Sequence, residues 1–377
     1  MNNIDCSLTK RNLGQFYTTN YKYILQNLEI PDDVKNIIEP FVGNGDLLNF
    51  INFEKKYKIE CYDIDPKVIC LSLLDKKNKN KSSNNIEVIK RDTLKNPPKY
   101  KNKFVLTNPP YLARNKSKEK SVFDKYNTND LYKCFLLELI KNKPLGGIII
   151  IPLNFFSSIR KSDIKLRHNF LKTFNIIKLN IFEEKVFDDT SYTICSFQFS
   201  LNKINQTTKN KVKLRNITIY PSKKNINVSL RKKYNYMIGG RLYHLPQNKN
   251  VKIDRLTSKN IKIKEKYITN IVVKCIDNNL ENKIGMSFVK DNERYVDTTK
   301  KLSARSFATL VIEYDNRSLN RDEQQLLVKK FNKYLEKYRK KYHSLFLTNY
   351  RESKDMARKR ISFKLIYEIT NYLLNFS

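Results

Sequence analysis

The sequence predicts an α/β protein, in which a seven-stranded, mostly parallel, doubly wound sheet is followed by a mixed α+β C-terminal domain. Seven short apolar runs recur along the first 200 residues. They are NIIEP (36–40), IECYD (59–63), IEVIK (86–90), KFVLT (103–107), GIIIIP (147–152), IIKLNIF (176–182) and YTICSFQFS (192–200). Helical spacing separates several runs, as in Leu131, Phe135, Leu136, Leu139 and Ile140. Strands that alternate with helices indicate a mostly parallel sheet with helices on both faces.

The last two runs and the following region set the expected boundaries. Only EEKVFDDTS separates those runs, which is too short for a crossover helix, so we expect an antiparallel pair at one edge of the sheet. After about residue 205 the alternation ends, and segments rich in Lys, Asn and Tyr follow. The sequence therefore predicts two domains, residues 1–205 and 206–377. A terminal helix is expected to carry, on one face, Ile361, Leu365, Ile369 and Leu373.

The composition is that of a folded, strongly basic protein. Hydrophobic residues make up 40% and aromatic residues 12% of the 377 residues, and the formal net charge is +36. This charge predicts attraction to a polyanion, either nucleic acid or an anionic membrane surface. Part of it is expected to be ordinary surface charge, as in the loop DKKNKNKSSNN (75–85).

Membrane, disulfide and metal signals are absent from the sequence. The N-terminus MNNIDCSLTKRN lacks the apolar segment of a signal peptide, and the longest aliphatic run, Ile148–Ile151, is too short to span a bilayer. We therefore expect a cytoplasmic protein that is not bound to a membrane. The six cysteines form no C-x-x-C pair and there are only three histidines, so neither a disulfide framework nor a zinc site is indicated.

A glycine turn follows the first predicted strand, in IIEPFVGNGDLL (37–48). Gly43 and Gly45 stand between a strand and a helix, where glycine allows the backbone to approach a nucleotide-like ligand. The third glycine of the dinucleotide fingerprint is missing, because Leu48 lies near its place. This departure argues against NAD or FAD.

Two aspartates end the next two predicted strands. Asp63, in YDIDP, lies about 20 residues beyond the glycines, where a carboxylate can accept hydrogen bonds from ribose hydroxyls. Alternatively, Asp63 and Asp65 cap the following helix. Asp92, in IKRDTL, has the position to accept from the exocyclic amine of an adenine, or it is an ordinary turn aspartate.

The fourth predicted strand ends in Asn108-Pro109-Pro110-Tyr111, at the sheet edge where ligands of α/β proteins bind. The two prolines hold the backbone rigid. The Asn108 side-chain oxygen and the Pro109 carbonyl can then accept both hydrogens of a flat amino group, and stabilise the positive charge that develops when its nitrogen attacks a methyl group. The Tyr111 ring is expected to stack on a planar substrate.

Several motifs in this order resemble the amino-group DNA methyltransferases that use S-adenosylmethionine. They are LGQFYTT, IIEPFVGNGDLL, ECYDIDP, KRDTL, TNPPY, NDLYKCFLLELI and GGIIIIPLNFF, within about residues 13 to 200. Their arrangement is similar to that of the gamma-class (N-P-P-Y) type II modification methylases. The resemblance implies a Rossmann-like methyltransferase sheet in residues 1–205 and a basic target-recognition domain in residues 206–377.

The resemblance also implies a role for individual residues. The cofactor-binding residues would be Thr18 near the methionyl carboxylate, Glu39, Gly43 and Gly45 around the methionyl group, Asp63 at the ribose, Asp92 at the adenine, and also Ile64 and Asn108. Asn108 and Pro109 would hold the target amine. Phe187 resembles the aromatic residue that packs on the flipped base, although Tyr192 is an alternative and Phe187 is otherwise a core residue.

The implied activity is methylation of adenine N6 at a specific site in double-stranded DNA. Asn rather than Ser before Pro-Pro resembles the N6-adenine enzymes more than the N4-cytosine enzymes. The implied cofactor is S-adenosylmethionine, with S-adenosylhomocysteine as product and no metal. The implied partners are double-stranded DNA and a restriction endonuclease that acts separately, and the protein is expected to be a monomer.

Three other functions are left open by the sequence. A basic second domain also suits RNA, and a flat amide amine is also the target of the protein glutamine methyltransferases, which have little chain after the catalytic domain. A binding module that keeps the fold without catalysis is the third. Four basic and aromatic runs support nucleic-acid binding: SLRKKYNY (229–236), GGRLYH (239–244), EKYRKKYH (336–343) and ARKRISFK (357–364).

Overall fold

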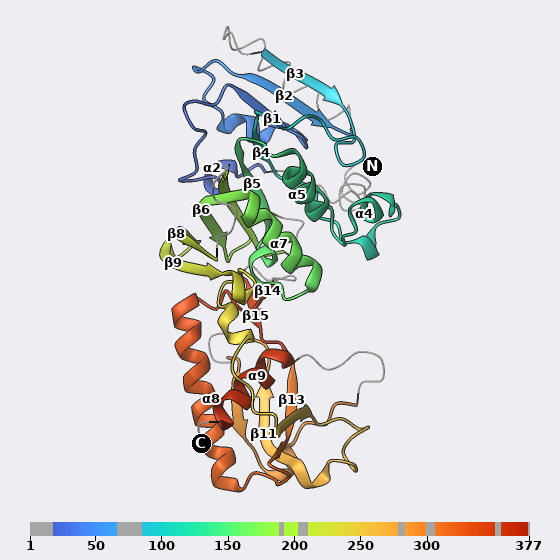
Figure 1. Ribbon diagram of the computed structural model, residues 1–377, viewed down its shortest axis with the longest axis vertical. Coiled ribbons are helices and arrows are strands. Elements are labelled where there is room, and N and C mark those ends of the chain that lie inside the picture. Colours follow the sequence, from blue (N-terminus) through green and yellow to red (C-terminus); the bar gives the residue numbers. More distant parts are fainter. Residues whose placement is uncertain are drawn as a thin grey trace, which may run out of the picture. The chain divides into compact units, whose positions relative to one another are not determined.

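The computed structural model describes residues 18–65, 85–187, 192–202, 210–277, 283–298, 306–350 and 356–375. These residues form two compact units. The first unit contains the described residues up to Tyr236 together with Met356. The second unit contains those from Met237 to Tyr350 and from Ala357 onward. Figure 1 shows the elements of each unit.

The first unit is built on a nine-stranded sheet with the order β3-β2-β1-β4-β5-β7-β6-β8-β9. The strands are β1 Asn36–Glu39, β2 Lys58–Asp63, β3 Asn85–Lys90, β4 Phe104–Thr107, β5 Gly146–Pro152, β6 Phe174–Phe182, β7 Ile194–Leu201, β8 Lys211–Tyr220 and β9 Lys224–Arg231. Strands β1 to β5 pair in parallel, so their carboxyl ends meet at one edge. Strand β7 runs antiparallel to both β5 and β6.

The seven predicted strands are present, but the sheet does not end with them. The predicted antiparallel pair is β6 and β7, and it lies inside the sheet rather than at its edge, because β8 pairs in parallel with β6 and β9 continues from β8. The first unit therefore extends past residue 205 to Tyr236, and the basic run 229–236 belongs to it. The physical reason is that β8 buries Val212, Leu214, Ile217 and Ile219 on this sheet.

The helices of the first unit connect these strands. They are α2 Tyr21–Ile24, α4 Ser121–Tyr126, α5 Leu131–Asn142, α6 Asn154–Ser157 and α7 Lys161–Thr173, with 3₁₀ turns η1 Asp46–Phe50, η2 Arg114–Lys116 and η3 Lys232–Tyr234. Helix α5 confirms the helix expected from Leu131 onward, and it packs on α7 (Figure 1). The helix expected after Asp65 and the loop 75–85 fall almost wholly on residues 66–84, outside the described residues.

The second unit is a mixed α+β structure with its own core. A four-stranded antiparallel sheet has the order β10-β13-β11-β12. The elements are η4 Gly240–Tyr243, β10 Val251–Arg255, η5 Glu265–Tyr267, β11 Ile268–Lys274, β12 Gly285–Phe288, η6 Asp291–Glu293, β13 Phe307–Tyr314, α8 Arg321–Tyr342, β14 Thr348–Tyr350, β15 Arg358–Arg360 and α9 Phe363–Leu374. Helices α8 and α9 cover the sheet with buried side chains such as Phe331, Leu335, Leu365 and Ile369.

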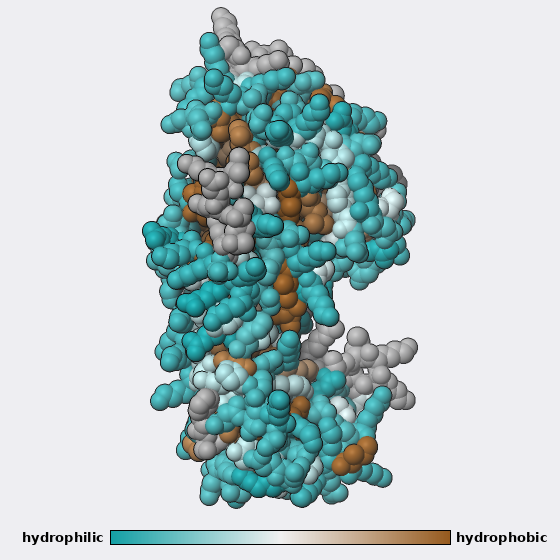
Figure 2. All heavy atoms as spheres, in the orientation of Figure 1, coloured by the Kyte–Doolittle hydropathy of each residue, from teal (hydrophilic) through white to brown (hydrophobic). Residues whose placement is uncertain are grey.

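The terminal helix differs in detail from its prediction. Leu365 and Ile369 are fully buried, as expected, but Ile361 precedes the helix, and Leu374 rather than Leu373 is buried at its end. Side chains visible on the surface of both units are mostly hydrophilic, and apolar ones occur in small groups (Figure 2). This surface fits the many Lys and Asn residues of the sequence.

Candidate active site

A cavity of about 550 Å³ opens at the carboxyl ends of the parallel strands in the first unit. Seven of the residues predicted from the sequence line it: Thr18, Gly43, Asp63, Ile64, Asp92, Asn108 and Pro110. Five other predicted residues are not among its lining residues: Glu39, Gly45, Pro109, Tyr111 and Phe187. Because a parallel sheet places successive strand ends side by side, Asp63 and Asn108 line one cavity although they are 45 positions apart.

The glycine turn is closed by Asp63. Gly43 and Gly45 have φ values of 48° and 76°, in the left-handed region that favours glycine. The Gly43 N–H donates to Asp63 Oδ2 at 2.9 Å, and the Asp65 N–H donates to Oδ1 at 2.9 Å. Burial raises the pKa of Asp63. Asp63 thus shapes the turn and lines the cavity, and each carboxylate oxygen has capacity for a further hydrogen bond.

Glu39 lies behind the cavity wall. Its side chain is fully buried, and Oε1 accepts from Thr107 Oγ1 at 2.7 Å and from the Phe41 N–H at 3.2 Å. Burial raises the pKa of Glu39 to about 8. No hydrogen bond to its Oε2 is found within the described part of the chain. Glu39 therefore joins β1 to Thr107, the residue before Asn108, and its predicted methionyl contact stays a prediction.

Asp92 has the geometry of a turn residue as well as a cavity position. Its Oδ1 accepts from the Leu94 N–H at 3.1 Å and from the Lys95 N–H at 3.0 Å. These hydrogen bonds are those of an ordinary turn aspartate, which is the alternative role that the sequence leaves open for Asp92. Because Asp92 also lines the cavity, its second carboxylate oxygen is available to a ligand amine.

Asn108 is held between two other residues of the predicted site. Its Nδ2 donates to Thr18 Oγ1 at 3.1 Å, and its Oδ1 accepts from the Tyr111 hydroxyl. The Tyr111 hydroxyl also lies 2.7 Å from the Ile150 carbonyl oxygen. Asn108 is only 9% exposed, and this small exposed part faces the cavity. These contacts fix the orientation of the amide, with Nδ2 toward Thr18 and Oδ1 toward Tyr111.

Tyr111 is not placed for base stacking in this conformation. Its side chain is 2% exposed, and its ring packs edge-to-face against Tyr132 and Tyr192, with centroid distances of 6.2 and 6.1 Å. Burial raises the pKa of Tyr111 well above its ordinary value. Its ring therefore has no free face for a planar substrate unless the side chain moves.

The two aromatic candidates between β6 and β7 are also placed by the structure. Phe187 is 5% exposed, which fits the alternative that it is a core residue. Tyr192 lies against the Tyr111 ring. Residues 188–191 lie outside the described residues. Base stacking by Tyr111 and Phe187 stays a prediction, and the structure brings Tyr192 closer to the N-P-P-Y segment than the sequence argument indicated.

Sequence reasoning missed one wall of the cavity, which comes from the segment after Tyr111. Leu112, Val122 and Phe123 give it an apolar face. Helix α4 is attached to the turn after β3, because Lys125 Nζ donates to the Leu94 and Lys95 carbonyl oxygens at 3.1 and 2.9 Å. The apolar pair in SVFDKY was the available signal, but its spacing alone does not distinguish a cavity wall from ordinary helix packing.

The lining suits a nucleoside with a polar tail. A volume of 550 Å³ lies within the range of about 300–1,000 Å³ that is common for small-molecule sites. Asp63 and Asp92 provide acceptors for hydroxyl and amine groups, while Phe123 and its neighbours provide an apolar wall for a planar ring. These residues fit S-adenosylmethionine, whose adenosine carries each of those groups.

Two further observations concern metals and membranes. Within residues 18–375, less the gaps given above, no group of three or more His, Cys, Asp or Glu side chains could hold a metal ion. In the same part of the chain, none of the helices combines the length and the apolar character needed to cross a bilayer. The four described cysteines, Cys61, Cys134, Cys195 and Cys275, are buried free thiols.

Comparison with known proteins finds a family model that matches part of the chain. Residues 13–187 match the model of the Eco57I restriction-modification methylase family. Over 202 residues the chain is 26% identical to the type II methyltransferase M.AccI of Acinetobacter calcoaceticus, which covers 49% of this chain and 36% of the relative. The chain thus spans about a third of that relative's length. The resemblance to S-adenosylmethionine-dependent restriction-modification methylases is confirmed for this region.

Solved structures of restriction-modification proteins are also similar. One is the methyltransferase subunit of a type I restriction-modification system from Streptococcus thermophilus, with 15% identity, a TM-score of 0.40, and coverage of 56% of this chain and 50% of that chain. Another is the type IIG restriction endonuclease BpuSI, with 14% identity, a TM-score of 0.40, and coverage of 71% of this chain and 38% of that chain.

Proposed function

We propose that the protein transfers a methyl group from S-adenosylmethionine to N6 of an adenine that is flipped out of duplex DNA, as the modification enzyme of a restriction-modification system. The position of Asn108 carries this proposal. Asn108 follows β4 and lines the same cavity as Asp63 and Asp92. An acceptor for a target amine and two acceptors for a nucleoside cofactor therefore share one cavity.

The cofactor would be held by residues of this chain. Bound S-adenosylmethionine would supply an electrophilic methyl group. Asp63 would accept from the ribose hydroxyls and Asp92 from the adenine amine, while Leu112, Val122 and Phe123 would pack against the ring. The closed turn at Gly43 would bring backbone close to the methionyl end.

Asn108 and Pro109 would act on the target amine. Their two carbonyl oxygens would accept its two hydrogens and favour a pyramidal nitrogen. Because positive charge develops on that nitrogen as it attacks the methyl group, these contacts would be stronger in the transition state than in the ground state. The amine is neutral before transfer, so its proton can leave to water afterwards without a dedicated base.

RNA base methylation is the second candidate, because the net charge of +36 suits either nucleic acid. Methylation of a protein glutamine fits less well, since a second unit with its own core follows the catalytic unit. Adenine rather than cytosine as the target rests on Asn108 in place of Ser before the two prolines.

The second unit is proposed to recognise the target sequence. Helix α8 carries eight cationic side chains: Arg321, Lys329, Lys330, Lys333, Lys337, Arg339, Lys340 and Lys341. Cations at such positions bind phosphates, while a smaller number of polar contacts read base edges. We further propose a cytoplasmic, monomeric enzyme whose partner endonuclease acts as a separate protein.

The test is a methyl-transfer assay with radiolabelled S-adenosylmethionine and three acceptors: mixed duplex DNA, structured RNA and a glutamine-bearing protein. We expect label in DNA only, recovered as N6-methyladenosine after digestion. The Asn108→Ala variant should lose roughly 100- to 1,000-fold in kcat, as for removal of one preorganised group at a transition state. Its binding of S-adenosylhomocysteine should stay largely intact.

Other distributions of the label would contradict parts of the proposal. Label in RNA or protein alone would keep the catalytic role of Asn108 but replace the substrate. Label recovered as N4-methylcytosine would correct the target base. An Asn108→Ala variant with an unchanged rate would remove Asn108 from the mechanism, and a protein that transfers no label would favour a binding module.

A further inference from the structure

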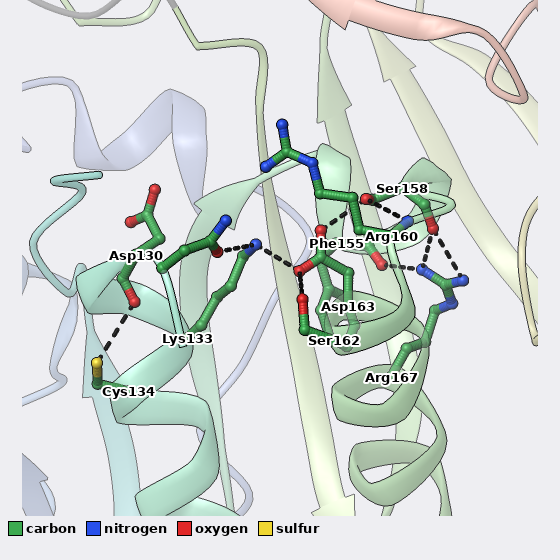
Figure 3. A network of polar contacts seen from close by, with 10 residues as sticks. Asp130, Lys133, Cys134, Phe155, Ser158, Arg160, Ser162, Asp163 and Arg167 are labelled. Atoms are coloured by element: carbon green, nitrogen blue, oxygen red, sulfur yellow. Dashed lines mark hydrogen bonds and ion pairs between the residues drawn. The ribbon is translucent and has the colours of Figure 1, made fainter. Parts of the chain in front are cut away.

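The loop after β5 comprises residues 153–160 and ends in the exposed residue Arg160. Hydrogen bonds hold the residues that precede Arg160 (Figure 3). Phe155, Phe156 and Ser157 are buried, whereas Ile159 is 36% exposed and Arg160 is exposed. The tip of this loop therefore stands away from the core. An exposed apolar residue next to an exposed cation is a combination that protein surfaces use for contacts with other molecules.

Two buried ionic side chains hold the base of the loop. Arg167 is 0% exposed, and its guanidinium donates to the carbonyl oxygens of Phe155 at 2.8 Å and Ser158 at 3.2 Å (Figure 3). Ser158 Oγ donates to Asp163 Oδ2 at 2.6 Å. A loop whose carbonyl groups and hydroxyl group are bonded in this way is preorganised, which lowers the entropy lost on binding.

Arg160 itself is not part of this network. Its backbone N–H contacts Ser158 Oγ at 3.4 Å, but its guanidinium makes no hydrogen bond or ion pair within the residues described. The nearest acid along helix α7, Asp163, already pairs with Lys133 Nζ at 2.5 Å. Arg160 also precedes the first residue of α7, where the helix dipole disfavours a cation. The fold therefore gains little from this charge.

The loop tip lies on the side of the candidate active site. Strand β5 pairs in parallel with β4, so the segments that follow these two strands, which carry Arg160 and Asn108, lie at the same edge of the sheet. The charge of Arg160 also opposes the burial that raises the pKa of Tyr192, whose ring packs against Tyr111 of the N-P-P-Y segment. An unpaired cation near this segment can attract a polyanionic substrate and hold it beside the reacting base.

We propose that Arg160 binds a backbone phosphate of the DNA target strand, next to the nucleotide that enters the active site. This inference rests on the proposed function. The guanidinium presents several donors to phosphate oxygens, and the hydrogen-bonded loop lies at the edge of the sheet where Asn108 follows β4. Arg160 would thus be a substrate-binding residue of the first unit, separate from recognition by the second.

The test compares DNA binding at several salt concentrations, measured by fluorescence anisotropy with a labelled DNA duplex that the protein methylates. Arg160→Ala should weaken binding at low salt and reduce the slope of log affinity against log salt by about 0.9, as for the loss of one phosphate contact. Arg160→Lys should restore most of the slope. Lys101→Ala is the matched control, because Lys101 is an exposed cation just before the amino end of β4, on the opposite edge of the sheet.

A slope unchanged in Arg160→Ala, or reduced equally in Lys101→Ala, would overturn the proposal. A reduction seen with an RNA hairpin and not with the duplex would overturn the choice of DNA. If the unchanged protein methylates no DNA, the proposed function fails, and the same salt titration with a labelled random-sequence duplex still shows whether Arg160 contacts phosphate. Unchanged binding of S-adenosylhomocysteine by Arg160→Ala would show that the variant is folded.

Discussion

At the scale of single residues, the candidate site depends on side chains that do two tasks. Asp63 closes the turn at Gly43 through its Oδ2 and also lines the cavity. Asp92 stabilises its own turn through Oδ1 and lines the same cavity. In both cases one carboxylate serves a structural role and lines the cavity, which explains why the sequence is compatible with either role.

Replacement of Asp63 is expected to weaken cofactor binding rather than abolish folding. Asp63→Ala removes the acceptor of the Gly43 N–H and a carboxylate from the cavity, so the dissociation constant of S-adenosylhomocysteine should rise roughly 10- to 100-fold. Isothermal titration calorimetry measures this change. Asp32→Ala, which removes an exposed carboxylate paired with Lys55, should leave the constant unchanged, and an equal effect of the two variants would contradict the role of Asp63.

Glu39 is expected to make stability depend on pH. Burial raises its pKa in the folded state to about 8, above the value of 4.5 for an exposed carboxyl, so the folded protein binds more protons than the unfolded chain between those values. The contribution of protonated Glu39 to the free energy of unfolding is therefore fully present below about pH 4.5 and is lost as the pH rises toward 8. Glu39→Gln keeps an acceptor for Thr107 without the titration.

Urea unfolding at pH 5, 6, 7 and 8 measures this effect. Relative to Glu39→Gln, the unchanged protein should lose free energy of unfolding as the pH rises. A difference between the two proteins that stays constant over this range would show that Glu39 does not titrate there. The Asp32→Ala variant again serves as control, because its carboxyl is exposed.

At the scale of elements, helix α4 is joined to the rest of the first unit by polar contacts of Lys125 and Tyr126. Lys125 Nζ donates to carbonyl oxygens in the turn after β3. Lys125→Met should raise the dissociation constant of S-adenosylhomocysteine by roughly three- to tenfold, because Val122 and Phe123 lose their fixed position. Asp124→Asn, which removes an exposed ion pair of the same helix with Arg114, should change it less than about twofold, since exposed ion pairs contribute little.

The same calorimetric titration checks this prediction. Equal effects of Lys125→Met and Asp124→Asn would indicate that the surface charge, rather than the attachment of the helix, controls the cavity. No effect of either variant would show that α4 holds its position through its other contacts, among them the hydrogen bond from the Tyr126 hydroxyl to Glu138 at 2.8 Å.

At the scale of the whole molecule, the sequence predicts what local patterns determine and misses what distant segments determine. Strands β1 to β7 follow from continuous apolar runs, and Asn108, Asp63 and Asp92 follow from their places after strands. Strand β8 falls in the predicted second domain because KVKLRNITIY alternates polar and apolar residues, and its partner residues in β6 lie 38 positions earlier, as in the pair Leu179 and Ile217. Burial of Tyr111 depends on Tyr132, Ile150 and Tyr192, three segments that no local pattern relates.

The extended sheet gives the last prediction. A fragment that ends at residue 205 lacks β8 and β9, so it exposes the edge of β6 together with apolar residues such as Leu179 and Ile181, which pair with Ile217 and Ile219 in the intact protein. An unpaired apolar edge of this kind favours aggregation. A fragment that ends at Tyr236 keeps the nine-stranded sheet, so it should remain monomeric in size-exclusion chromatography and bind S-adenosylhomocysteine, whereas the shorter fragment should elute as aggregates. If the two fragments are equally soluble and bind equally well, β8 and β9 contribute nothing essential to the first unit, and residue 205 rather than Tyr236 is its functional boundary.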